Sequence, residues 1–182
     1  MLLLAAISFH AAAFTCSRAE EPPRTSNSSP AVTAGAGTPE IARPTRKEAR
    51  RQAETLHRAL HATLQIVHHR YYREDEGLPI PAAVMKDVFA ELEKEQQIKL
   101  RWLVVEGQAM NTDHKAKDDF EVAAVKALKS GQQEYDEVQD GVYRRAGAIT
   151  LSNHCLKCHV PDRKNTNDRT AGLIIAIPIQ DD

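Results

Sequence analysis

The feature that most constrains this chain is a run of six residues near its C-terminal end, which reads His-Cys-Leu-Lys-Cys-His and spans residues 154–159. It contains Cys-x-x-Cys-His, the attachment signature of c-type haem. The spacing suits that chemistry, because Cys155 and Cys158 can form thioethers with the two vinyl groups of the ring while His159 binds the iron. The sequence therefore predicts one covalent haem c, which the fold has to enclose.

Two other chemistries use closely spaced cysteines, namely zinc binding and a thioredoxin-like dithiol. Zinc would take Cys155 and Cys158 together with His154 and His159, but structural zinc sites normally draw on two separated ligand pairs. A dithiol of the thioredoxin kind follows a strand in a βαβ pattern, which this sequence does not show. Haem attachment is the preferred interpretation, and zinc binding is the alternative if no haem is attached.

The N-terminal segment predicts export, in agreement with the attachment of haem c outside the cytoplasm. Residues 1–13 form an apolar run too short for a permanent membrane span, and Ser17-Arg18-Ala19 offers small residues to a signal peptidase. We expect a signal peptide over 1–19, removed together with Cys16, although no Lys or Arg precedes the apolar run. Residues 20–44 are rich in Pro, Ser, Thr, Ala and Gly and predict a disordered linker. A folded domain over 45–182 remains, in the periplasm or an equivalent exported location.

Length and charge narrow the classes of partner. The 182 residues suffice for one domain, and the net charge of −1 gives no reason to expect nucleic acid or an anionic membrane surface. No segment after the N-terminal run is apolar enough for a permanent membrane span. The expected partner is therefore a redox or signalling protein.

Hydrophobic periodicity predicts an α+β domain built on an antiparallel sheet. A capping box, Thr45 to Glu48, starts a long N-terminal helix that runs to about residue 72. The other expected elements are helices over 82–96 and 119–129, strands over 98–104, 133–138, 142–146 and 171–179, and a turn at Asp140-Gly141. This order argues against the all-helical cytochrome c′ bundle.

The stretch from Ala82 to Ile179 resembles a family of c-haem domains that was first defined as a domain of unknown function and is related to a cyanobacterial Tll-type haem protein. The resemblance rests on the Cys-Leu-x-Cys-His run, on Gly172 followed by an apolar strand, and on the loop 111–121, a loosened form of the family's Asn-Pro-x-Asn loop. It implies a PAS-like fold, with an antiparallel sheet and flanking helices. Such domains occur alone or as periplasmic sensor domains of histidine kinases.

The resemblance also bears on the second iron ligand, since the family often carries a Cys in the early helix that can serve as that ligand. The matching position here is Met85, whose thioether would raise the reduction potential relative to a thiolate. The alternative role for Met85 is a core methionine. Further candidates are His57, His61 and His68, on one line of the long helix, and, with less weight, Met110 and His114 in a loop. An open or water-bound iron remains a further alternative.

Iron ligation decides which function is expected. Two strong protein ligands suit electron transfer or redox sensing, and an open site suits the binding of a gas or a peroxide. We expect a periplasmic mono-haem c-type protein that acts in redox or ligand sensing or in one-electron transfer and is not an enzyme. A basic cluster near the motif, formed by Lys157, Arg163, Lys164 and Arg169, would steer an acidic redox partner. The alternative is a peroxidase-like haem enzyme, for which the sequence nominates no distal acid–base pair.

Overall fold

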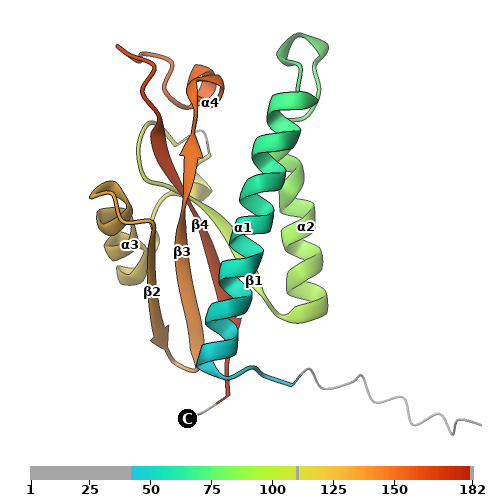
Figure 1. The fold of residues 1–182 in the computed structure, drawn as a ribbon, viewed down its shortest axis with the longest axis vertical. Coiled ribbons are helices and arrows are strands. Elements are labelled where there is room, and N and C mark those ends of the chain that lie inside the picture. The colour runs from blue at the N-terminus through green and yellow to red at the C-terminus, as the bar shows by residue number, and fades with distance from the viewer. Residues whose placement is uncertain (1–41, 110, 181–182) are drawn as a thin grey trace, which may run out of the picture. The chain divides into compact units, whose positions relative to one another are not determined.

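The centre of the domain is a four-stranded antiparallel sheet with the strand order β1-β4-β3-β2 (Figure 1). The computed structural model describes residues 42–109 and 111–180. Its strands are β1 (Lys99–Val104), β2 (Glu134–Gln139), β3 (Val142–Leu151) and β4 (Arg169–Pro178). Its helices are α1 (Arg46–Arg70), α2 (Pro81–Gln96), α3 (Asp119–Lys129) and α4 (Asn153–His159), with the 3-10 turns η1 (Glu74–Glu76) and η2 (Thr112–His114).

The predicted α+β class is confirmed, including the antiparallel sheet, the flanking helices and the long N-terminal helix. The predicted signal peptide (1–19), the linker as far as residue 41, and Met110 lie outside the described residues. Among the helices of the described part, none is both long enough and apolar enough to cross a membrane.

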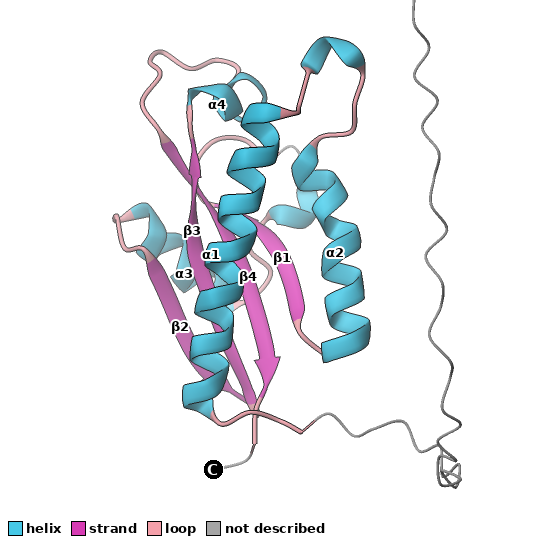
Figure 2. Cartoon of the chain, turned by 45° about the vertical axis from the view of Figure 1, so that its right-hand side comes forward, coloured by secondary structure: helices cyan, strands magenta, loops and turns pink. Residues whose placement is uncertain are grey.

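The sheet lies between two helical layers (Figure 2). On one face, α1 and α2 pack over a core that includes Leu173 and Ile175 of β4. On the other face, α3 packs over a second core that includes Ile174. Successive side chains of a strand point to opposite faces, so β4 has to be apolar at nearly every position when both faces are covered.

Short-range signals fix the ends of several elements. At the start of α1, the backbone N–H of Thr45 donates to the Glu48 carboxylate at 2.9 Å, and the N–H of Glu48 donates back to the Thr45 hydroxyl at 3.3 Å. Asp118 caps α3 by accepting from the N–H of Glu121 at 2.9 Å. Asp140-Gly141 turns the β2–β3 hairpin with φ of +52° and +70°, as a two-residue hairpin turn requires.

The two largest differences from the prediction lie at and next to the Cys-x-x-Cys-His run. Strand β3 continues to Leu151 rather than ending at residue 146, because the positions from Gly147 onward pair with β4. The run itself forms α4, which the periodicity did not predict, since seven residues are too few to display a helical period. As a result α4 lies in the connection between the two central strands, beyond the end of β3.

Candidate functional site

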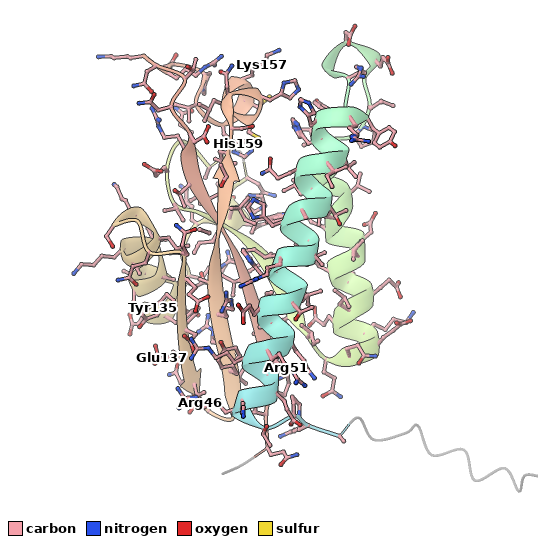
Figure 3. The ribbon with its side chains drawn as sticks, viewed as in Figure 1. Arg46, Arg51, Tyr135, Glu137, Lys157 and His159 are labelled. Atoms are coloured by element: carbon pink, nitrogen blue, oxygen red, sulfur yellow. The ribbon has the colours of Figure 1, made fainter. Side chains whose placement is uncertain are left out.

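Helix α4 carries both cysteines of the motif, together with Lys157 and His159, which Figure 3 labels. Leu156 is fully buried and anchors the helix, whose first turn is closed by the N–H of Cys155 donating to the carbonyl of Ser152 at 2.8 Å. Cys155 and Cys158 are three residues apart, which places them side by side on the helix surface. Both are half-buried free thiols. They are therefore available for bond formation with a partner in front of this helix.

The loop that follows β1 supports the end of α4 that carries His159. The backbone N–H of Gln108 donates to the carbonyl oxygen of His159 at 3.2 Å. Gly107 has a φ of +87°, and a Cβ there would lie 2.8 Å from the same oxygen, so only glycine suits this close approach. His159 is half-buried, and burial lowers the pKa of its imidazole. The lowered pKa favours the neutral ring, which is the form that binds metals.

A cleft opens in front of Cys155, Cys158 and His159, all of which border it. Its other walls come from the end of α1, the start of α2, η2 and the end of β3. The apolar side chains on these walls are Leu64, Ile80, Ala82, Ala83, Ile149 and Leu151. A largely apolar cleft bordered by two thiols and an imidazole suits a flat apolar ring that is held by thioethers and by one iron ligand.

Lys86 of α2, Asn111 and His114 also border this cleft, and His114 lies near both of the others, with its backbone N–H donating to the carbonyl of Asn111 at 3.0 Å. Nε2 of His114 is buried and has no hydrogen-bond partner among the described residues. Burial lowers the pKa of His114, as do the nearby charges of Lys86 and Arg101. A buried ring nitrogen without a partner, beside a lysine and an amide, fits a bound carboxylate such as those that haem carries.

An ion-paired arginine fixes the turn that carries His114. Arg101 of β1 donates to the carbonyl oxygens of Asp113 and Lys115, the second at 3.0 Å. The same guanidinium pairs with Glu121 of α3, a carboxylate that is only 3% exposed. Because its charge is balanced there, Arg101 can hold both backbone carbonyls of the turn in place.

The polar side chains of α1 that face β3 form hydrogen bonds to its backbone. Nε2 of His57 lies 3.1 Å from the carbonyl oxygen of Ala148, which accepts from the protonated nitrogen. The N–H of Thr150 donates to Nε2 of His61 at 3.3 Å, and Gln65 donates to the carbonyl of Thr150 at 2.7 Å. Neither His57 nor His61 borders the cleft. The structure therefore places these two predicted ligand candidates in the contact between helix and sheet.

The remaining ligand candidates separate into two environments. Met85 is buried in the core with Phe89 and Trp102 and does not border the cleft, so the structure does not bring it together with the cysteines. His68 does border the cleft, as does His114. The residues that border it and that sequence reasoning did not nominate include the polar side chains of Gln65, Tyr72 and Lys86. Helical spacing held a signal for Tyr72, which follows His68 by four residues.

Zinc finds no ready site in the part of the chain that the structure describes. Nowhere in residues 42–109 or 111–180 do three His, Cys, Asp or Glu side chains come close enough together to hold a metal ion. His154, which the zinc interpretation requires, is exposed and packs its ring edge-on against His68 at 5.2 Å between centroids.

Comparison with known proteins identifies the family. Residues 42–175 match the sequence pattern of the Tll0287-like family, whose description is Tll0287. The chain belongs to the Tll0287-like family. The match confirms the resemblance seen from Ala82 onward and extends it across α1, the helix that forms one wall of the cleft.

A solved structure agrees with this Tll0287-like assignment. The crystal structure of the cyanobacterial heme-protein Tll0287 is similar, with a TM-score of 0.56 and 14% sequence identity. The similarity covers 74% of this chain and 98% of that chain. At this identity the likeness establishes the fold alone. No curated protein matches the sequence.

Proposed function

We propose that this Tll0287-like chain is a mono-haem c-type protein in which Cys155 and Cys158 hold one haem covalently and His159 binds its iron. One observation carries the proposal. Both free thiols and the half-buried imidazole border the same largely apolar cleft. Membership of the Tll0287-like family and the fold shared with a heme-protein support it.

The attachment chemistry balances without an oxidant. Each cysteine thiol adds across one vinyl group, so that a carbon–sulfur bond forms, the S–H bond breaks, and the proton passes to the other vinyl carbon. Reduced thiols are required for this addition, and no disulfide joins Cys155 to Cys158. The neutral form of His159 then supplies the electron pair that binds iron.

The rest of the cleft is suited to enclosing the ring. Its apolar walls exclude water, and Lys86, Asn111 and His114 offer hydrogen-bond donors to the ring's carboxylates on one side. When bound, a haem supplies a one-electron ferric–ferrous couple. We therefore propose one-electron transfer or redox sensing in the periplasm as the role of the chain, rather than catalysis.

Two arginines of the predicted basic cluster form hydrogen bonds to nearby backbone carbonyls. Arg163 donates to the carbonyl of Leu156 at 3.3 Å, and Arg169 donates to the carbonyl of Asn167 at 2.6 Å. These two guanidinium groups hold the loop that follows α4. We therefore assign any steering of an acidic partner chiefly to Lys164, which is exposed.

The deciding experiment is expression of the full chain with c-type maturation machinery, followed by intact mass and a pyridine haemochrome spectrum. We expect one covalent haem with both vinyl groups saturated, and its loss in the double variant C155A/C158A. The matched control is His154→Ala, because zinc binding by the motif requires His154 and haem attachment does not. Absence of covalent haem from the wild-type chain, together with zinc that His154→Ala releases, would refute the proposal. Recovery of the haem protein from a periplasmic extract tests the location.

A further inference from the structure

We infer that His68 of α1 is the second axial ligand of the iron, so that the chain holds its haem between two histidines. The inference rests on the proposed haem attachment and adds the residue that closes the iron's other side.

The face of α1 that carries His57, His61 and Gln65 bonds to the backbone of β3 over successive turns. His68 follows His57 by 11 residues, which is about three turns of an α-helix, and therefore lies almost directly in line with it. Strand β3 ends at Leu151, one residue after Thr150, to whose backbone His61 and Gln65 bond. The imidazole of His68 thus continues a row of sheet-bonding side chains past the point where the sheet stops.

Beyond that point lies the cleft, and His68 borders it. The side chain is half-buried, and neither ring nitrogen has a hydrogen-bond partner among the described residues. Its contacts are with rings, Tyr72 at 5.0 Å and His154 at 5.2 Å between centroids. Since His154 directly precedes Cys155, His68 lies beside the helix that carries the attachment residues. A half-buried neutral imidazole whose lone-pair nitrogen is unpartnered in either tautomer would be a strong iron ligand in such a place.

His114, which also borders the cleft, has different surroundings from His68. Nε2 of His114 is buried, and the ring lies near the cationic groups of Lys86 and Arg101. Positive neighbours favour a bound carboxylate over a bound cation. His114 also comes from the loop that continues from Gln108, the residue that supports His159 from behind. His68 comes instead from α1, a different wall of the cleft. We therefore assign His114 to the carboxylates of the ring and His68 to its iron.

The test uses the full haem-loaded chain and compares optical and electron paramagnetic resonance spectra of the wild type with His68→Ala, His69→Ala and His114→Ala. His69 is the matched control, because it is the adjacent histidine on the same helix, is exposed, and does not border the cleft. We expect low-spin ferric iron in the wild type and in the His69 and His114 variants. We expect His68→Ala to become high-spin while its mass still includes the haem, and added imidazole to restore the low-spin spectrum.

The other possible results of this experiment would contradict the assignment of His68. A low-spin His68→Ala protein overturns the inference, and loss of the low-spin signal in His114→Ala alone would give the ligand role to His114. High-spin iron in the wild type also overturns it, in favour of an open site. In all three cases the haem is still attached covalently, so the proposed function stands while the assignment of His68 fails. Lack of covalent haem in the wild type would instead refute both the assignment of His68 and the proposed function. Circular dichroism of each variant verifies that the fold is kept.

Discussion

The imidazole of His57 on α1 lies over Gly147 on β3 so closely that a Cβ at residue 147 would fall 2.5 Å from both Cδ2 and Nε2 of the ring. The glycine therefore sets how near the long helix approaches the sheet. This contact explains why His57, which the sequence made a candidate ligand, is buried against a strand instead.

Substituting Gly147→Ala tests this contact directly. The added methyl group has to displace His57 or the whole helix, and overpacking of this kind costs about 1–3 kcal/mol. We expect a lower free energy of unfolding in urea. In the double variant H57A/G147A the methyl group has room, so the two substitutions should cost less together than the sum of their separate effects. Strict additivity would show that the two residues do not compete for the same space.

A second prediction concerns pH and the same histidine. Burial, followed by the charge of Arg145 and then that of His61, lowers the pKa of His57 below its ordinary value of 6.5. The unfolded chain therefore binds the proton more tightly than the folded chain does. The contribution of neutral His57 to the free energy of unfolding is complete above pH 6.5 and is lost as the pH falls through the pKa of the folded state. A single group can contribute a slope of at most about 1.4 kcal/mol per pH unit.

The measurement is the free energy of unfolding between pH 7.5 and about pH 5, for the wild type and for His57→Gln. Glutamine can still donate to the carbonyl of Ala148 but does not titrate. We expect the wild type to lose stability more steeply than the variant as the pH falls. Parallel curves would mean that His57 is protonated equally easily in the folded and unfolded chains. The remaining slope of the variant reports the other buried histidines, His61 among them, whose pKa burial also lowers.

These contacts show which parts of the fold were accessible from the sequence. Short-range signals such as the Thr45–Glu48 capping box and the Asp140-Gly141 turn act over a few residues, and they predicted their elements correctly. The His57–Gly147 contact joins residues 90 positions apart, and nothing local to either one signals it. Strand β3 was predicted five residues too short, because its residues from Gly147 onward are held by pairing with β4, which no local signal shows.

The candidate site also has one part that could be predicted from the sequence and another part that could not. Cys155, Cys158 and His159 could be predicted because their chemistry requires adjacency in the sequence. The rest of the cleft comes from α1, α2, η2 and β3, and depends on how these elements pack. Asp118 illustrates the limit, because its cap on α3 joins residues three positions apart, whereas its ion pair with Arg144 at 2.7 Å depends on tertiary structure.

A third prediction addresses the buried carboxylate behind the polar side of the cleft. Glu121 is 3% exposed, pairs with Arg101 and with Arg144, and accepts from the N–H of Lys117 at 2.7 Å. Removing one partner of a buried pair typically costs about 3–5 kcal/mol. We expect Glu121→Ala to fall near 3 kcal/mol, roughly the lower end, since Arg101 is partly exposed and can regain water. Asp119→Ala, on an exposed side chain of the same helical turn, is the control and should cost far less.

Glu121→Ala should also loosen the turn that carries His114, because Arg101 loses the charge that balances it. In the haem-loaded chain we expect faster hydrogen exchange over residues 111–117 than in the wild type, with the iron spectrum unchanged. Equal exchange in this segment would mean that the turn is held without Arg101. A changed iron spectrum would instead indicate that His114 binds the iron, in contradiction to the assignment of His68.

The last prediction concerns Met85, the ligand candidate that the family resemblance implied. Its side chain is 8% exposed and lies in the core with Phe89 and Trp102, whose rings are 5.0 Å apart between centroids. Iron ligation would require the sulfur to leave this core, since Met85 does not border the cleft. Met85→Leu keeps the volume and usually costs less than about 1.5 kcal/mol, whereas Met85→Ala leaves a cavity and costs about 2–5 kcal/mol. Neither should alter the iron spectrum of the haem-loaded chain. Loss of the low-spin spectrum in Met85→Leu, with the fold intact by circular dichroism, would show that the haem-bound protein moves α2 and takes the thioether as its ligand.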